Sequence, residues 1–144
     1  MSLQLSNKTY VVMGVANERS IAWGVAKRLL EEKATVIFTY RKDRSKSKID
    51  KLLADYADYN TATFMCDVNS DESIQQAFTQ IGGQFGQIDG IVHSVAFAHA
   101  EDLRTNFINT SRDGYAFAQD TSAYSLVAVA KAAQPYFTPN SSIV

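Results

Sequence analysis

The chain has 144 residues, a length typical of one domain, and 46% of them are hydrophobic and 20% charged, as in an ordinary globular protein. Its formal net charge of -1 offers no electrostatic basis for binding nucleic acid or an anionic membrane surface. No stretch approaches the roughly 18 uninterrupted apolar residues of a membrane span. Cys66 is the only cysteine, which excludes an intrachain disulfide and a cysteine metal site and suits a reducing, cytoplasmic location.

Short apolar runs alternate with longer amphipathic segments along the chain. The run at residues 9–13 is nearly continuous and of strand-forming types, as expected of a strand buried on both faces. Between residues 21 and 32, apolar side chains recur at helical spacing and charged ones lie elsewhere. Asp71 is the expected cap of a later helix. The other expected strands are 35–40, 61–66, 90–94 and 141–144, and the other expected helices are 49–56, 71–85 and about 111–136.

Strands that alternate with helices at this spacing predict a parallel sheet with right-handed crossovers. We therefore expect an α/β fold with a doubly wound, Rossmann-like parallel sheet. Residues 141–144 would open a fifth strand, so we expect the sheet to be truncated in that strand.

The turn after the first strand is the first place to look for a ligand, because doubly wound sheets bind ligands beyond the carboxyl ends of their strands. The turn runs from Gly14 to Gly24 without the G-x-G-x-x-G pattern. Gly14 allows a tight turn, Ser20 can cap the following helix or face an anion, and Gly24 permits close packing or ligand approach. A helix N-terminus offers N–H groups to a diphosphate. The alternative is an ordinary strand–turn–helix with Ser20 as a structural cap.

Several segments together resemble one family. Gly14 followed by Ser20-Ile21-Ala22 and Gly24 resembles the nucleotide loop of bacterial enoyl-(acyl-carrier-protein) reductases, divergent members of the short-chain dehydrogenase/reductase superfamily. The other segments similar to this family, in chain order, are Thr39 to Lys42, Cys66 to Val68, His93 to Ala98 and Ala118 to Leu126. The resemblance implies that residues 1–144 are the N-terminal part of a single dinucleotide-binding reductase domain.

Cations follow the second expected strand, where an acidic residue would accept hydrogen bonds from the ribose of NAD. Five of the eight residues 41–48 are Lys or Arg, and a guanidinium can hold a 2′-phosphate in bidentate fashion. Family members with a pair like Arg41-Lys42 are similar to those that prefer NADPH. The expected cofactor is therefore NADP, with NAD less favoured, and the structural alternative is a solvated basic turn.

The residues expected to contact the dinucleotide are Gly14, Ser20, Ile21, Arg41, Lys42, Asp43, Arg44, Ser45, Asp67, Val68 and Val95. For Asp67 the resemblance implies a contact with adenine, and a loop-capping role is the alternative. The resemblance also implies that Ala98 contacts the acyl substrate. We expect His93 to be packed or hydrogen-bonded in the core and His99 to be solvated. Since no third ligand accompanies these histidines, no metal site is expected.

Tyr124 and Lys131 are seven residues apart, which is the spacing of the family's catalytic tyrosine and lysine. In the family that pair follows the fifth strand, whereas Tyr124 precedes it here. We therefore expect Tyr124 to pack in its helix or contact another subunit, and the catalytic pair to lie beyond Val144. The resemblance further implies a homotetramer for the full-length form.

The leading hypothesis is an oxidoreductase of fatty acid biosynthesis, which uses NADPH to reduce the trans-2-enoyl double bond of acyl-carrier-protein thioesters. Residues 1–144 alone are expected to be inactive and to bind the cofactor weakly. One alternative is another short-chain reductase, although the Gly-x-x-x-Gly-x-Gly turn and the Asn-Asn-Ala-Gly segment of such enzymes are missing from this sequence. The other alternative is a non-catalytic dinucleotide-binding module.

Overall fold

The computed structural model of the chain describes residues 3–144. Its five strands form one parallel sheet in the order β3-β2-β1-β4-β5. Because the order reverses between β1 and β4, the expected doubly wound α/β sheet is confirmed. The strands are β1 (Thr9–Met13), β2 (Thr35–Tyr40), β3 (Thr61–Met65), β4 (Ile88–His93) and β5 (Phe137–Ile143).

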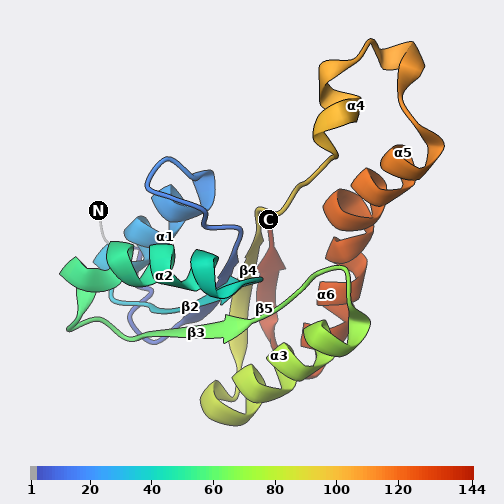
Figure 1. Ribbon diagram of the computed structural model, residues 1–144. Coiled ribbons are helices and arrows are strands. Elements are labelled where there is room, and N and C mark those ends of the chain that lie inside the picture. Colours follow the sequence, from blue (N-terminus) through green and yellow to red (C-terminus); the bar gives the residue numbers. More distant parts are fainter. Residues whose placement is uncertain (1–2) are drawn as a thin grey trace.

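Helices cover both faces of the sheet (Figure 1). The helices α1 (Ile21–Glu31) and α2 (Asp43–Leu53) pack on one face, and α3 (Asp71–Phe85) and α6 (Ser125–Ala133) on the other. Each face of the sheet has its own hydrophobic cluster, and successive β1 side chains alternate between them. Val12 belongs to the cluster on the α1 and α2 face, whereas Val11 and Met13 belong to the cluster on the α3 and α6 face. Burial on both faces explains the continuous apolar run in the sequence.

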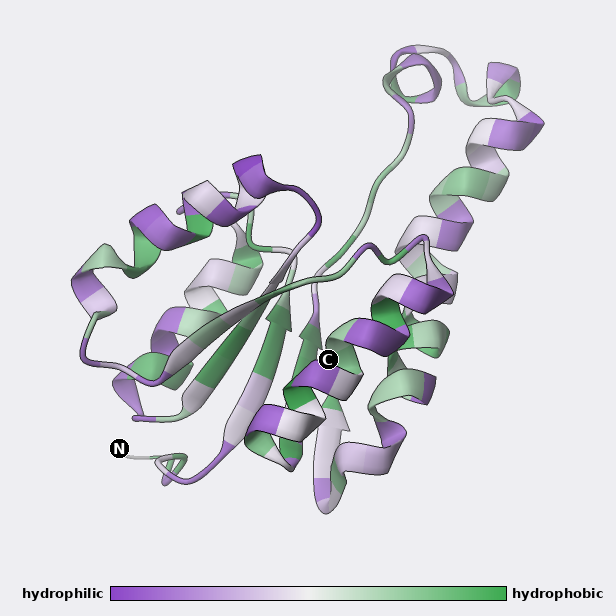
Figure 2. Ribbon diagram, turned by 60° about the horizontal axis from the view of Figure 1, so that its bottom comes forward, coloured by the Kyte–Doolittle hydropathy of each residue, from purple (hydrophilic) through white to green (hydrophobic). Residues whose placement is uncertain are grey.

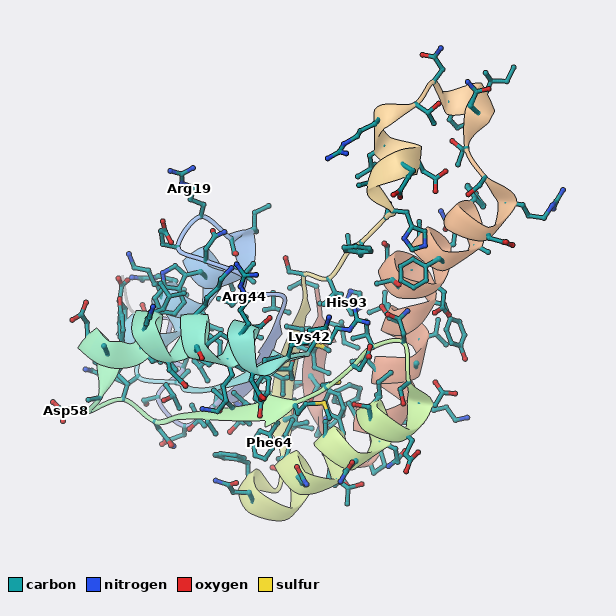
Figure 3. The ribbon with its side chains drawn as sticks, in the orientation of Figure 1. Arg19, Lys42, Arg44, Asp58, Phe64 and His93 are labelled. Atoms are coloured by element: carbon teal, nitrogen blue, oxygen red, sulfur yellow. The ribbon has the colours of Figure 1, made fainter. Side chains whose placement is uncertain are left out.

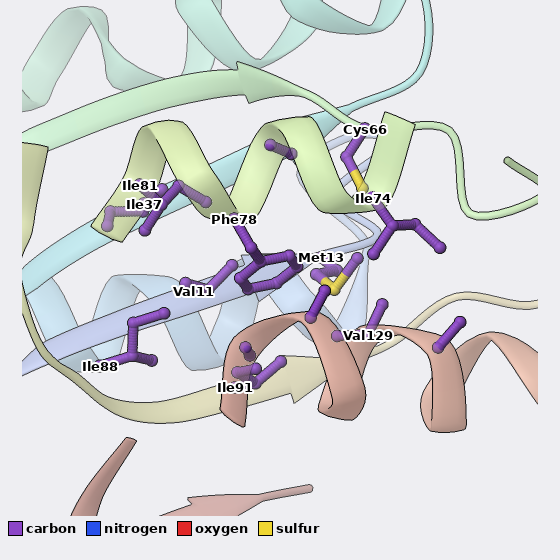
Figure 4. Packing of buried hydrophobic residues seen from close by; sticks show 14 residues of the cluster. Val11, Met13, Ile37, Cys66, Ile74, Phe78, Ile81, Ile88, Ile91 and Val129 are labelled. Carbon is purple, nitrogen blue, oxygen red and sulfur yellow. The ribbon is translucent and has the colours of Figure 1, made fainter. Parts of the chain in front are cut away.

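The core on the α3 and α6 face is centred on the fully buried ring of Phe78 (Figure 4). Aliphatic side chains of the central strands surround the ring, including Val11 and Ile91. The hydropathy colouring shows the same arrangement, with apolar residues gathered along the strands and polar residues on the outer surfaces of the helices (Figure 2). The core therefore stabilises the sheet, and the carboxyl ends of the strands remain available to line a binding site.

One expected helix start and one expected helix cap were wrong. The helix expected to start at residue 49 begins at Asp43, with Lys42 as its N-cap residue. Its first turns are polar and only Ile49 is fully buried, so the sequence shows no apolar spacing there. An i,i+4 pair between Lys46 and Asp50 (2.8 Å) supports this exposed helix. The cap of α3 is not Asp71 but Ser70, whose hydroxyl accepts the N–H of Ser73 (3.2 Å).

The long helix expected at residues 111–136 is not a single α-helix. It consists of α5 (Arg112–Gln119), a π-helical segment (Asp120–Tyr124) and α6. A 3₁₀ turn (Gln134–Tyr136) then leads into β5, which begins four residues earlier than the expected 141. The early part of β5 contains Pro139 and exposed residues, so it carries no alternating apolar pattern, and its pairing with β4 is irregular between Ile88 and Gly90.

A hairpin precedes α5 and stands away from the sheet (Figure 1). It contains the short helix α4 (Ala100–Arg104) and a 3₁₀ turn (Phe107–Asn109), neither of which the sequence predicted. The carboxylate of Asp102 closes the hairpin by accepting the N–H of Ser111 (2.9 Å). In the part of the chain described, none of the helices has the length and apolarity needed to cross a membrane.

Candidate dinucleotide site

A cavity of about 270 Å³ opens at the carboxyl ends of the strands. Residues that follow β1, β2, β3 and β4 line it, together with Thr121 of the π-helical segment. The cavity thus lies at the point where the strand order reverses, between β1 and β4. Doubly wound sheets bind dinucleotides across this crevice.

The structure gathers part of the expected site around this cavity. Gly14, Arg41, Ser45, Val68 and Val95 line it. The lining does not include Ser20, Ile21, Lys42, Asp43, Arg44, Asp67 or Ala98. The first set comes from four separate strand ends, so the sequence motifs do converge in space.

The turn after β1 requires glycine at position 14. Gly14 has φ +96°, which side-chain-bearing residues rarely adopt, and a Cβ added there would lie 1.9 Å from the carbonyl oxygen of Ser94. The backbone of β1 and the loop after β4 therefore touch directly at the base of the cavity. Gly24 differs, because a Cβ added there would meet nothing within 4 Å. The expectation that Gly24 permits close packing within this chain was wrong.

Ser20 occupies the N-cap position of α1, but its side chain does not cap the helix. Its Oγ turns back and accepts the N–H groups of Ala16 (2.9 Å) and Asn17 (3.1 Å), which closes the loop. The first turn of α1 also holds no acidic residue. The start of α1, with the backbone N–H of Ile21, thus keeps the partial positive charge that favours an anion.

Basic residues gather where β2 leads into α2. The Nε of Arg41 lies 3.3 Å from a carboxylate oxygen of Asp67, and the Arg41 side chain remains 51% exposed at the cavity edge. Figure 3 shows Lys42 and Arg44 at the start of α2, the end of that helix nearest the cavity. Among the described residues, this edge therefore offers cations to an anionic ligand group.

The loop after β3 is held by its own hydrogen bonds. The carboxylate of Asp67 accepts the N–H of Asn69 (3.0 Å), and the Asp67 N–H donates to Ser73 Oγ (2.8 Å). This is the loop-capping role that the sequence left open. Burial raises the pKa of the neighbouring Cys66 thiol to about 12, and the Asp67 carboxylate adds to the rise. Cys66 therefore lines the cavity as a protonated, unreactive side chain.

The loop after β4 forms the other side of the cavity through Ser94, Val95, Ala96 and Phe97. His93 precedes this loop and its Nε2 lies 2.8 Å from Ser125 Oγ, which confirms the expected hydrogen-bonded histidine. Partial burial is the main cause that lowers the pKa of His93 below its ordinary value. His99 is exposed, as expected.

Five polar residues that line the cavity were absent from the expected site set: Thr39, Tyr40, Asn69, Ser94 and Thr121. Thr39 is buried at the end of β2, Asn69 lies in the loop after β3, and Thr121 reaches the cavity from the π-helical segment. Asn69 and Thr121 are joined by a hydrogen bond of 2.7 Å. The segments similar to the family contain Thr39, Tyr40, Ser94 and Thr121, whereas Asn69 lies outside them and only the fold brings it to the cavity.

Tyr124 and Lys131 lie together, away from this cavity. They line a second, smaller hollow of about 100 Å³ with Asp71 and Gln75 of α3. Tyr124 is 52% exposed. The pair therefore does not reach the carboxyl ends of the strands, as expected from its place before β5.

The sheet order and the cavity at its switch point define the chain as a Rossmann-like, doubly wound α/β domain. Over residues 14–144 the sequence matches the family described as enoyl-(acyl carrier protein) reductase. The chain belongs to that family.

Relatives and solved structures agree. The chain is 50% identical over 142 residues to the NADPH enoyl-acyl-carrier-protein reductase FabI of Staphylococcus aureus, covering 99% of this chain and 56% of the relative. It is 51% identical over 140 residues to the NADH enzyme FabI of Enterococcus faecalis, covering 97% and 54%. The Bacillus cereus reductase, solved with NADP+ and an indole naphthyridinone, superposes with a TM-score of 0.89 and 43% identity, covering 96% and 53%. The chain thus spans about half the length of the relatives it matches.

Proposed function

We propose that residues 1–144 form the N-terminal part of a single reductase domain and hold most of its dinucleotide site. The supporting observation is the cavity at the switch point, where Gly14 brings the turn after β1 against the loop after β4. The start of α1 is suited to the diphosphate, because its first turn carries no acidic residue and no side-chain cap. The complete site set remains Gly14, Ser20, Ile21, Arg41, Lys42, Asp43, Arg44, Ser45, Asp67, Val68 and Val95, with Ala98 on the substrate side.

The proposed cofactor is NADP, with NAD less favoured. Arg41 and Ser45 line the cavity edge where the 2′ position of the adenosine ribose belongs, and Lys42 and Arg44 stand nearby. The names of the relatives include both NADPH and NADH, so they do not decide between the two cofactors. The preference for NADP therefore rests on the cations that follow β2.

The complete protein is proposed to reduce the trans-2-enoyl double bond of acyl-carrier-protein thioesters. When bound, the nicotinamide supplies the hydride, and the enolate that results needs stabilisation. The residues that line the cavity bind and orient the cofactor, and we propose that the catalytic tyrosine and lysine lie beyond Val144. Residues 1–144 alone are then inactive.

The remaining parts of the proposal concern partners and location. Acyl-carrier-protein thioesters are the proposed substrates, and the full-length form is a proposed homotetramer. Apolar side chains exposed on α5 and α6, such as Tyr115 and Val127, support burial by a second subunit. The buried free thiol of Cys66 supports a reducing, cytoplasmic location.

Family membership favours enoyl reduction over the two alternative functions. Another short-chain reductase would use the same cavity with a different substrate, and a non-catalytic module would bind dinucleotide without turnover. A direct test measures oxidation of NADPH and NADH by the complete protein with a crotonyl thioester, with residues 1–144 assayed in parallel. We expect faster turnover with NADPH by the complete protein and none by residues 1–144. If the complete protein binds neither cofactor, the proposal fails. If it binds cofactor without enoyl reduction, one of the alternatives holds.

A further inference from the structure

The π-helical segment interrupts a helix at the side of the cavity. Within Asp120–Tyr124 the turn widens, so that the N–H of Ser125 donates to the carbonyl of Asp120, five residues back. Such π-bulges are rare and occur frequently at functional sites. The segment contributes Thr121 to the cavity, and Ser125, which follows it, contacts His93 at the end of β4.

Side chains fix the wide turn on two sides. Asn69 donates from Nδ2 to the carboxylate of Asp120 (2.9 Å) and to Thr121 Oγ1 (2.7 Å). Ser125 donates from Oγ to the carbonyl of Thr121 (2.6 Å). Since its proton is used there, the same Oγ accepts from Nε2 of His93 (2.8 Å). The segment is therefore tied to the loop after β3 and to the last residue of β4.

Ser122 makes the third connection, and it is the one that reaches the loop after β4. Its Oγ accepts the N–H of Phe97 (3.1 Å) and donates to the carbonyl oxygen of the same residue (3.3 Å). One hydroxyl thus satisfies both backbone groups of Phe97. The residues just before it, Val95 and Ala96, line the cavity. Ser122 itself does not line the cavity, so its effect on a ligand must pass through this loop.

The position of the loop after β4 indicates which half of a bound dinucleotide it would contact. In a doubly wound sheet the two halves on either side of the switch point hold the two halves of the dinucleotide. The β1-β2-β3 half carries the cations suited to the adenosine 2′-phosphate. The β4-β5 half, with the loop 94–97, is left for the nicotinamide half.

We propose that the π-helical segment sets the shape of the nicotinamide end of the cavity, with Ser122 as the positioning residue that holds the loop after β4. The proposal rests on the proposed function, because it requires that the cavity bind a nicotinamide dinucleotide. It assigns to Ser122 a role in affinity for one half of that ligand only.

The test compares a whole and a half ligand on the 144-residue chain. Binding of NADPH and of 2′,5′-ADP, which lacks the nicotinamide half, is measured by titration of the ¹⁵N-labelled chain followed by NMR. In Ser122→Ala we expect NADPH to bind about three- to tenfold more weakly, the equivalent of one lost hydrogen bond, and 2′,5′-ADP to bind as before. Amide exchange at Phe97 should also become faster.

Two variants serve as controls. Ser122→Thr keeps the hydroxyl and should restore most of the NADPH affinity, whereas Arg41→Gln should weaken both ligands. The inference is overturned if Ser122→Ala weakens the two ligands equally or neither, or if the unaltered chain binds both with the same affinity. If the unaltered chain and the complete protein bind neither ligand, the proposed function itself fails and the inference falls with it.

Discussion

The two sides of the cavity are built in different ways. The turn after β1 is local: Gly14 turns the chain, and the hydroxyl of Ser20 closes the loop on backbone groups three and four residues away. The loop after β4 is held from a distance, because Ser122 contacts Phe97 across 25 residues of sequence. A change in the first side should therefore strain the backbone, and a change in the second should loosen a loop.

The largest expected effect is at the local side. In Gly14→Ala the new methyl group would collide with the backbone of Ser94 and the residue would keep a positive φ. We expect the free energy of unfolding to fall by about 3 kcal/mol or more, as for a strained backbone combined with overpacking. Urea denaturation followed by circular dichroism measures the change. NADPH binding should be lost in the same variant.

Gly24 provides the matched control on the same turn and helix. Its Cβ position is open and it lies on the exposed face of α1, so Gly24→Ala should stabilise the chain by about 0.5–1 kcal/mol through helix propensity. If both alanine variants lost the same stability, general damage to α1 would explain the result, and the special role of Gly14 would be contradicted.

A smaller effect is expected at the distant side. Ser125 is completely buried and its Oγ is the partner of His93 Nε2. Ser125→Ala leaves that nitrogen without its partner, and we expect a loss of about 1–3 kcal/mol in urea denaturation. Ser47 is the control, because it also donates to a carbonyl four residues back but lies exposed on α2. Ser47→Ala should change stability by less than about 0.5 kcal/mol.

The same contrast explains how much the sequence could predict. Strand runs buried on both faces, and a glycine where the first strand ends, are local signals, and both identified real features. The start of α2 was missed because its polar first turns carry no apolar period, although Lys42 and Asp43 begin a helix. A helix of this kind is stabilised by burying one face against the sheet, and in α2 Ile49 is the only fully buried residue of that face.

The distant side could not be predicted for a different reason. The residues of the π-bulge at Asp120–Tyr124 are not of a type that distinguishes a π-helix from an α-helix. The bulge depends on hydrogen-bond partners that the fold brings from β4 and from the loop after β3. A helical pattern read by spacing alone passes smoothly through it. Two polar residues within the pattern, Thr121 and Ser125, are buried, but only the fold shows their burial.

A pH effect should accompany the distant side. Burial lowers the pKa of His93, so the folded chain takes up its proton less readily than the unfolded chain. The stability from neutral His93 is complete above the ordinary value of about 6.5 and is lost as the pH falls through the lower folded value. The urea midpoint should therefore fall on acidification from pH 8 to pH 5, by less than Ser125→Ala causes. The part of this slope due to His93 should be absent in His93→Gln, and an unchanged slope would contradict its assignment.

The smallest effect on stability is expected for Asp67, and nucleotide binding by the same variant tests whether Asp67 also contacts the adenine. Its ion pair with Arg41 is partly exposed, so Asp67→Asn, which keeps an acceptor for the N–H of Asn69, should cost no more than about 1 kcal/mol. If the carboxylate competes with a 2′-phosphate for Arg41, the substitution should strengthen 2′,5′-ADP binding about two- to fivefold, since one favourable charge pair no longer has to be broken. Binding of 5′-AMP, which has no 2′-phosphate, should then stay unchanged. Weaker binding of both nucleotides would instead indicate that Asp67 contacts the adenine, and the pairing with Arg41 would be incidental.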